Sequence, residues 1–282
     1  MSRRFSQVDV FSGTGLHGNA LAVVHDAEGL DDERLAAFAR WTNLSETTFL
    51  LPPTHEAADY RVRIFTTGGE LPFAGHPTLG SAHAWLEAGG RPQRDDVVVQ
   101  ECGVGLVEVR RTGTALAFAA PPLLRSGALA PGERAEVVAA LGLDEGLVLG
   151  AEWIDNGPGW VGVELGSARA VLAVEPVLAL AGELKAALIG RWDPVEAAAL
   201  GKDVEVRAFY GDGTAFAEDP VTGSANAGLA QWLIGAGRLP ERYVAGQGAR
   251  LGRDGRVGVV REGGQVWIGG EVRTTIRGEV AL

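Results

Sequence analysis

The pattern of apolar and polar positions predicts a chain with more strands than helices. Stretches such as residues 5–10 and 60–65 alternate or run apolar over a few positions, which is typical of strands. Further strands are expected at 19–24, from 47 onward, 97–100, 104–110, 115–119, 160–165, 204–209, 257–260, 266–268 and 272–276. Apolar residues three and four apart predict helices at 32–40, 77–88, 133–141, 177–188, 194–200 and 220–234.

One ten-residue stretch occurs twice, about half the chain apart. Residues 73–82 read FAGHPTLGSA and residues 216–225 read FAEDPVTGSA, with six of the ten positions identical. Internal self-similarity at this spacing predicts two like domains rather than a solenoid. Pro121-Pro122 and the loose stretch after it suggest the boundary. We therefore expect an α+β protein with domains at 1–120, completed by a last strand at about 270–282, and at 121–269.

The repeated stretch has the composition of a strand, a loop and a helix start. Proline suits the first helical position, so Pro77 and Pro220 are expected to open the two helices. That places His76 and Asp219 at the N-caps, where aspartate is favoured and histidine is not. Since each half then carries one long helix among many strands, we expect each half to wrap a sheet around its central helix.

A glycine follows in each copy, and it is expected in the first helical turn. Glycine within a helix costs about 1 kcal/mol relative to alanine, so Gly80 and Gly223 suggest that something approaches the backbone closely. Free N–H groups and the positive end of the helix dipole make such a terminus an anion site. A repeated packing contact between helix and sheet is the alternative.

Composition narrows the function classes. Nearly half of the 282 residues are apolar, and the formal charge of −11 argues against a basic surface for nucleic acid or anionic membrane. Cys102 is the only cysteine, and no cysteine–histidine cluster has zinc-ligand spacing. The chain opens without a signal-peptide pattern and contains no apolar run of membrane-spanning length, so a cytoplasmic location is expected.

Several familiar motifs are incomplete. The G-x-G-x-x-G at residues 13–18 is followed by strand-like residues instead of a helix, so a loop is favoured over a dinucleotide site. Asn19, at the end of that loop, could reach a ligand, but a turn-stabilising role is favoured. Ser81 and Ser224 lie outside any G-x-S-x-G elbow. His76 and His83 share a helix face but lack the acidic residues expected of a metal site.

The remaining candidates are acid–base groups: Glu46, His76 and Asp219. Glu46 stands where a strand begins, a position that is usually only solvated. If the two helix starts faced each other, an anionic substrate could bind between them, and a carboxylate or imidazole could move protons on it. The residues alone do not select the reaction.

The same stretches resemble the PhzF-like family, which is named for phenazine biosynthesis. The matching motifs are VDVF at 8–11 with Gly18-Asn19, NLSETTF at 43–49, RIFT at 63–66, ELPFAGHPT at 70–78, EDPVTGSA at 218–225 and Gln247-Gly248. They follow the family order along essentially the whole chain. The resemblance implies the diaminopimelate-epimerase fold: two similar domains, each a mostly antiparallel sheet rolled around a central helix, with the active site in the interdomain cleft.

The resemblance also implies roles for individual residues. The glutamate of the NLSETTF motif, Glu46, would shuttle a proton in an isomerisation that needs no cofactor and no metal. His76, Asp219 and Ser224, with the backbone at Gly75 and Gly223, would position a small carboxylated substrate. Thr67 stands where proline is expected and Asn226 where a small residue is expected, which leaves the substrate open. A homodimer is expected from the family.

Three functions compete. A PhzF-like isomerase uses Glu46 as acid and base. A metabolite-binding protein on the same fold would give Glu46 no role. An amino-acid racemase without thiol bases is the third, since the two catalytic cysteines of the epimerases are absent from both repeated stretches and Cys102 lies outside them. Replacing Glu46 by glutamine would separate the first two.

Overall fold

The computed structural model describes residues 2–211, 213 and 216–282, and its contacts divide the chain into two compact units. Unit 1 contains Met1–Ala119 and Gly269–Leu282, and unit 2 contains Ala120–Ile268. One long strand, β17 (Gln265–Ala281), begins in unit 2 and continues in unit 1. Among the described helices, none is both long and apolar enough to cross a membrane.

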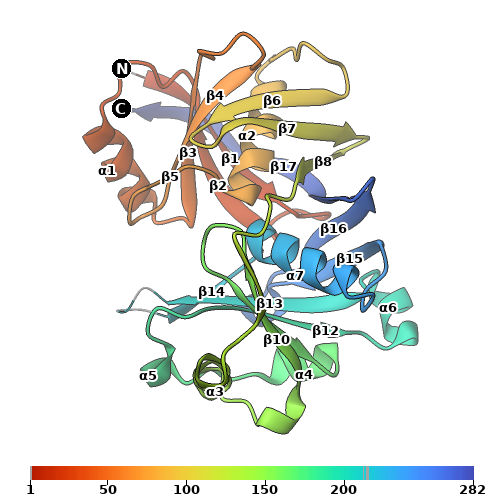
Figure 1. The fold of residues 1–282 in the computed structure, drawn as a ribbon. Helices are drawn as coiled ribbons and strands as arrows, with labels where there is room; N and C mark the ends of the chain where they lie inside the picture. Colours follow the sequence, from red (N-terminus) through yellow and green to blue (C-terminus); the bar gives the residue numbers. More distant parts are fainter. Residues whose placement is uncertain (1, 212, 214–215) are drawn as a thin grey trace. The chain divides into compact units, whose positions relative to one another are not determined.

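Unit 1 is built on a mostly antiparallel sheet (Figure 1). Its strands are β1 (Ser2–Val10), β2 (Asn19–Val24), β3 (Glu46–Leu51), β4 (Tyr60–Phe65), β5 (Glu70–Leu71), β6 (Val97–Cys102), β7 (Gly105–Thr112) and β8 (Ala115–Ala119). The pairs β2–β3 and β4–β6 are parallel, whereas β1–β2, β3–β4, β6–β7 and β7–β8 are antiparallel. The last part of β17 pairs with β1, with Ser2 opposite Ala281.

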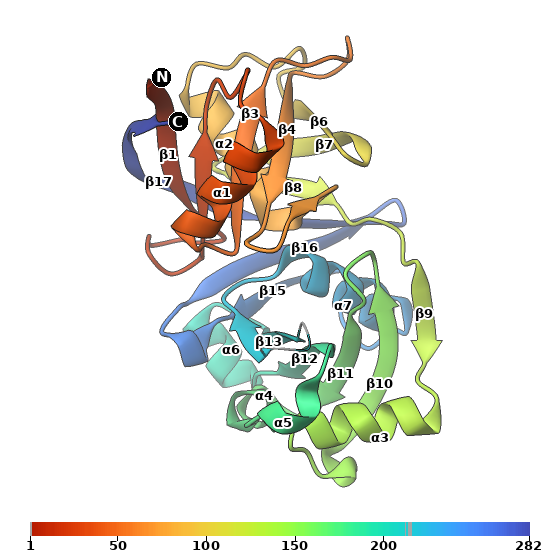
Figure 2. The same ribbon diagram turned by 90° about the vertical axis from the view of Figure 1, so that its left-hand side faces the viewer.

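The sheet of unit 1 rolls around one helix. Helix α2 (Gly75–Glu87) contacts β1, β2, β3, β4, β6, β7 and β8, and Figure 2 shows it inside the curve of these strands. Helix α1 (Asp32–Thr42) lies outside the curve, capped by Asp31 and turning Leu35 and Phe38 inward as its apolar spacing predicts. The expected sheet around a central helix is therefore confirmed in this unit.

Unit 2 repeats this order of elements. Its strands are β9 (Arg125–Ala128), β10 (Val148–Asp155), β11 (Val161–Leu165), β12 (Lys185–Arg191), β13 (Val204–Gly211), β14 (Phe216–Asp219), β15 (Arg242–Gln247) and β16 (Gly255–Glu262). The pairs β11–β12 and β13–β15 are parallel, in the places that β2–β3 and β4–β6 occupy in unit 1. Helix α7 (Gly223–Gly235) contacts β10, β11, β12 and β16 as the central helix of this unit.

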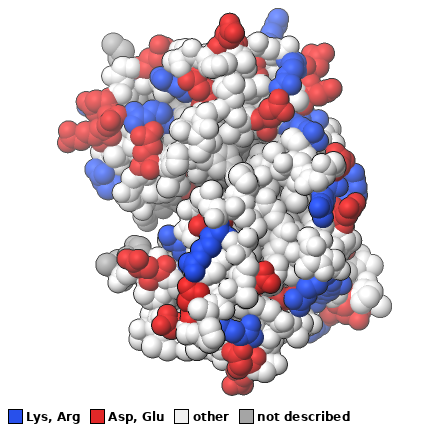
Figure 3. Space-filling view, viewed as in Figure 1, with Lys and Arg blue, Asp and Glu red and all other residues white. Residues whose placement is uncertain are grey.

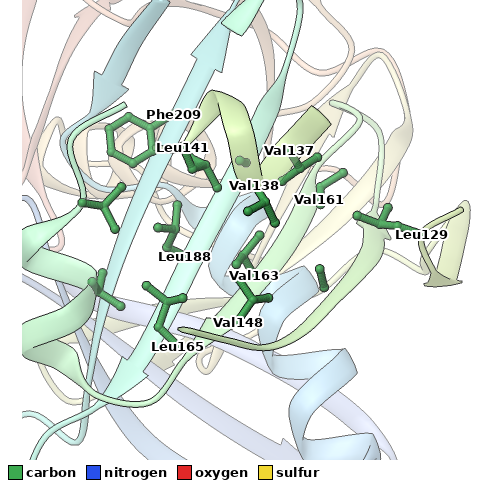
Figure 4. Packing of buried hydrophobic residues seen from close by; sticks show 14 residues of the cluster. Leu129, Val137, Val138, Leu141, Val148, Val161, Val163, Leu165, Leu188 and Phe209 are labelled. Atoms are coloured by element: carbon green, nitrogen blue, oxygen red, sulfur yellow. The ribbon is translucent and has the colours of Figure 1, made fainter. Parts of the chain in front are cut away.

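Short helices complete unit 2. They are α3 (Pro131–Ala140), η1 (Glu145–Leu147), α4 (Ala168–Ala173), α5 (Leu178–Ala181), α6 (Pro194–Leu200) and η2 (Ala249–Leu251). Apolar side chains from α3, β10, β11 and β12 form a buried cluster that includes Leu141, Val163 and Leu188 (Figure 4). This core lies wholly within unit 2.

Two side-chain contacts recur in the two units. On the hairpin β4–β5, Arg63 pairs with Glu70, and on the hairpin β13–β14, Arg207 pairs with Glu218. On the neighbouring parallel strand, Gln100 donates to Thr78 of α2 at 3.0 Å, and Gln247 accepts from Asn226 of α7 at 2.9 Å. The last pair explains why residue 226 is polar although it is buried.

These contacts correct the alignment of the repeat. Glu70 corresponds to Glu218 and Thr78 to Asn226, so Gly75 corresponds to Gly223, the first residue of each central helix. The shared FA-x-x-P-x-x-GSA letters are thus displaced by five residues from the structural equivalence. Both central helices carry glycine at their sixth position, Gly80 and Gly228.

The glycine at the sixth position faces the sheet of its own unit. A Cβ on Gly80 would lie 2.5 Å from Leu21 Cδ2, and one on Gly228 would lie 2.4 Å from the backbone oxygen of Ile154. Gly80 is therefore beyond the first helical turn, contrary to expectation, and the close approach there is helix-to-sheet packing. Gly223 does lie in the first turn.

Two further expectations were wrong. The segment 177–188 is helical only at Leu178–Ala181, because the chain turns at Gly182 and then enters β12, where Ala186, Ala187 and Leu188 are buried between neighbouring strands. The loose stretch after Pro122 contains a strand, β9, which pairs with β10.

On the face shown in Figure 3, basic and acidic side chains are interspersed.

Candidate active site

In unit 1 the chain brings together Glu46 and His76. Glu46 is the first residue of β3, and His76 is the second residue of α2. Glu46 Oε2 lies 3.3 Å from His76 Nε2, and the two side chains are 15% and 6% exposed. Two acid–base groups that are thirty residues apart in the sequence thus meet where α2 begins under the sheet.

His76 is not the helix cap that its proline neighbour suggested. Helix α2 begins at Gly75 after Ala74, so Pro77 is the third helical residue. Proline is tolerated there because the first backbone N–H groups of a helix have no partner within it. The consequence is that His76 is inside the first turn and buried, with its side chain turned to the sheet and not to solvent.

Burial sets the charge of His76. Removal from water lowers the pKa of this imidazole to about 3, because the charged form loses its hydration. His76 is therefore neutral near pH 7. A neutral imidazole, and not an imidazolium, therefore lies beside the carboxyl group of Glu46.

A third residue, Asn19, completes this group. Its Nδ2 lies 3.4 Å from Nδ1 of His76, and its side chain is 2% exposed. Asn19 is the first residue of β2, at the end of the loop that holds the glycine-rich motif. That loop joins the antiparallel strands β1 and β2, as predicted. The turn-stabilising role that the sequence favoured for Asn19 misses this contact, and only the Gly18-Asn19 family motif indicated its importance.

In unit 2 the start of α7 carries a different set of groups. Asp219 is the last residue of β14, not a helix cap, because the chain bends at Pro220 and Val221, Thr222 is extended, and α7 begins only at Gly223. The carboxylate of Asp219 accepts a hydrogen bond from the hydroxyl of Thr222. Asp219 is thus attached to the helix start through one side chain.

Gln247 organises this region. Its Oε1 accepts from the backbone N–H of Thr222 at 3.0 Å, and its Nε2 donates to the backbone oxygen of Asp219 at 3.1 Å and to Thr222 Oγ1 at 2.9 Å. Gln247 is 1% exposed. The sequence pointed to it only through the family motif, without a role.

Ser224 is the second residue of α7 and so corresponds to His76 of α2. Its Oγ accepts a hydrogen bond from the indole Nε1 of Trp160 at 2.9 Å. Because that contact uses an oxygen lone pair, the hydroxyl proton of Ser224 remains to donate to another acceptor. Asn156 donates to the backbone oxygen of Ser224 at 2.9 Å, which fixes the turn further.

The predicted site residues therefore form two groups, each within one unit. Glu46, His76 and Gly75 belong to unit 1, and Asp219, Gly223 and Ser224 belong to unit 2. The acid–base pair lies in the first group, and a donor hydroxyl at a helix N-terminus lies in the second. Within the described part of the chain, no three histidine, cysteine or acidic side chains gather as metal ligands would.

A family model described as phenazine biosynthesis-like protein, PhzC-PhzF, matches residues 8–281. The chain belongs to this family. A trans-2,3-dihydro-3-hydroxyanthranilate isomerase of Pseudomonas aeruginosa is 33% identical over 268 residues, which cover 92% of this chain and 91% of that protein. Antisense-enhancing sequence 1 of Schizosaccharomyces pombe is 34% identical over 293 residues, with 98% and 97% of the two chains covered.

The fold is that of the PhzF family as well. The crystal structure of a phenazine biosynthesis protein of the PhzF family from Enterococcus faecalis matches all of both chains with a TM-score of 0.80, at 24% sequence identity. The resemblance noted from the sequence motifs is thus confirmed for family and fold. Relatives of this PhzF-family chain include proteins named isomerases, which supports isomerase chemistry.

Proposed function

We propose that this PhzF-family protein is an isomerase that moves a proton on a small carboxylated metabolite, cyclic ones included, without a cofactor. Glu46 takes a proton from one carbon of the substrate and returns a proton to another. The double bond moves in the opposite sense, so atoms and charge balance. A homodimer in the cytoplasm stays part of the proposal.

The contact between Glu46 and His76 carries the proposal. An acid–base group is useful when it is held in a water-poor place near a partner that controls its proton. Glu46 has both conditions, since its side chain is only 15% exposed and lies 3.3 Å from a buried imidazole. A glutamate without a role would be expected in water, as is usual at the start of a strand.

The groups at the start of α7 suit the carboxylate of the substrate. Backbone N–H groups in the first turn of a helix have no partner within the helix, and the dipole there favours an anion. Ser224 adds a hydroxyl donor at this point. We propose that both groups of residues serve one substrate, with Ser224 and Gly223 holding its carboxylate and Asp219 positioning its ring or chain.

The test is a ligand screen followed by turnover. Small aromatic and cyclohexadiene carboxylates are added to the wild type and to Glu46→Gln, and thermal unfolding is followed. A ligand at a hundred times its Kd stabilises the folded protein by about 2.7 kcal/mol. We expect both proteins to bind the same ligand and only the wild type to isomerise it in deuterated water, with deuterium entering the product.

Two variants control for general damage. Glu33→Gln changes an exposed glutamate of α1 in the same unit and is expected to keep turnover. Cys102→Ser is expected to keep it as well, because no thiol takes part. Equal turnover by Glu46→Gln would remove Glu46 from the mechanism. Binding without turnover by the wild type would favour the metabolite-binding protein, and deuterium at the α-carbon of an amino acid would favour the racemase.

A further inference from the structure

Asn19 contacts the ring nitrogen of His76 that faces away from Glu46. Its Nδ2 lies 3.4 Å from Nδ1, whereas Nε2 of the same ring lies 3.3 Å from Glu46 Oε2. Asn19 and His76 are 2% and 5% exposed. The three side chains therefore form a line from β2 through the start of α2 to the start of β3, in which Asn19 and His76 are buried and Glu46 keeps a small exposed fraction.

The tautomer of His76 follows from which end of the Asn19 amide faces Nδ1, and in this structure it is the nitrogen. An amide nitrogen only donates, so Nδ1 of His76 must accept, and a neutral imidazole then carries its one proton on Nε2. Nε2 is the ring nitrogen that lies 3.3 Å from Glu46 Oε2, although the two atoms do not meet hydrogen-bond geometry in this structure. We propose that Asn19 is a positioning residue that holds His76 in the Nε2–H tautomer and thereby keeps Glu46 ionised, as the base that removes the substrate proton. The role of Glu46 in this inference rests on the proposed function.

The backbone around Asn19 leaves it little freedom. Asp9 is 3% exposed and accepts from the N–H groups of His17 at 3.1 Å and Gly18 at 2.9 Å. Residue 18 must be glycine, because a Cβ there would lie 2.0 Å from the backbone oxygen of Val10. Asn19 is paired opposite Val10 in the sheet. The loop and the strand together aim the amide at His76.

An aspartate in place of Asn19 would reverse the arrangement with almost the same shape. A carboxylate beside Nδ1 accepts a proton from it, so the proton would move to Nδ1 and Nε2 would become an acceptor. Nε2 would then favour the protonated form of Glu46. One atom at position 19 thus decides whether the glutamate starts as a base or as an acid.

Nitrogen NMR of the imidazoles tests the tautomer without any substrate. Histidine labelled with ¹⁵N is incorporated into the wild type, Asn19→Asp and Asn19→Ala, and His76→Gln identifies the signals. The wild type is expected to carry its proton on Nε2, Asn19→Asp on Nδ1 or on both nitrogens, and Asn19→Ala a mixture. His25, buried in the same unit with Nε2 3.0 Å from Ser6 Oγ, serves as the internal reference and should not change.

Turnover supplies the second readout. Asn19→Asp is expected to lower kcat about 10²-fold, with KM nearly unchanged, because the base form of Glu46 is lost while the substrate contacts remain. A wild-type proton on Nδ1 would overturn the inference, as would an Asn19→Asp protein that keeps the Nε2–H tautomer. If Asn19→Asp does not fold, the wild type and Asn19→Ala decide. Full turnover by Glu46→Gln together with the Nε2–H tautomer would overturn the proposed function but leave the contact of Asn19 with His76 in place.

Discussion

The imidazole of His76 is only 5% exposed and lies beside the carboxyl group of Glu46, so burial governs its charge. A histidine before a proline at a helix start suggests an exposed cap, yet α2 begins one residue earlier and the side chain turns inward. The acid–base character of Glu46 and His76 could be inferred from residue type and family motif. The contact between Glu46 and His76, and the position of Asn19 beside His76, could not be inferred in this way. They depend on the pairing of β2 with β3, which no local sequence pattern encodes.

His76 should make stability depend on pH. Its pKa falls from 6.5 in the unfolded chain to about 3 in the folded protein, so the unfolded chain takes up a proton first as the pH falls. The stabilising contribution is complete above pH 6.5 and is lost progressively toward pH 3. Linkage at about 1.4 kcal/mol per pH unit gives a loss of about 2 kcal/mol between pH 7.5 and 5.

Urea unfolding of the wild type and of His76→Gln over this range measures that loss. Burial also lowers the pKa of His25, but His25 is present in both proteins, so the difference between them isolates His76. Between pH 7.5 and 5, the free energy of unfolding should fall by about 2 kcal/mol less in the variant than in the wild type. Parallel pH profiles for the two proteins would contradict a buried, neutral His76.

At the scale of elements, the central helices touch their sheets through glycine. Gly80 of α2 is pressed against Leu21, Val8 and Val10, and Gly228 of α7 against Ile154. The repeat in the sequence predicted two like helices correctly. Its register was misleading, because the letters shared by the two copies are not the structurally equivalent residues. The packing glycine of the second helix, Gly228, lies just beyond the repeated letters.

Alanine at these glycines should therefore destabilise the protein. Gly80→Ala and Gly228→Ala each force a helix away from its sheet, and overpacking of this kind costs about 1–3 kcal/mol. Gly228→Ala is expected to cost more, since its neighbour is backbone oxygen and not a flexible side-chain end. Urea unfolding midpoints measure both.

Gly235, the last residue of α7, is the matched control, because a Cβ there meets nothing within 4 Å. Gly235→Ala should be neutral or stabilising by up to about 1 kcal/mol, as expected from helix propensity. A similar loss in all three variants would mean that glycine acts through the backbone of the helix and not through its contact with the sheet.

At the scale of the whole molecule, the order of the elements along the chain could be predicted from the sequence. The sharing of one strand by the two units could not. Alternation in 5–10 and 60–65 gave strands, and Pro121-Pro122 lies close to where the contacts divide the chain. Residues 266–268 and 272–276 were expected as separate strands, but they belong to the single strand β17, which the two units share. A continuous strand with glycine in its middle reads locally as two.

The sharing of β17 predicts how the chain can be divided. Residues 120–268 hold a complete buried core, and their two ends are joined, since Ala120 donates to Val266 at 2.8 Å and Gln265 donates to Ala120 at 3.0 Å. This fragment should therefore fold alone and unfold cooperatively. Residues 1–119 alone should not, because β1 loses the partner that runs from Val272 to Ala281.

A rearranged unit 1 tests the reason for that difference. Ser2 lies opposite Ala281, so a short glycine–serine linker can join residue 282 to residue 2 and give the order 269–282, linker, 2–119. This protein should recover cooperative thermal unfolding and dispersed amide NMR signals, because β1 regains its partner strand within one chain. The same rearrangement with Val272 and Ile276 changed to proline removes backbone donors from the restored strand and serves as the control. Cooperative folding of residues 1–119 alone would show that unit 1 does not need the last part of β17. Failure of residues 120–268 to fold, while the whole chain folds, would show that the core of unit 2 is not sufficient for its stability.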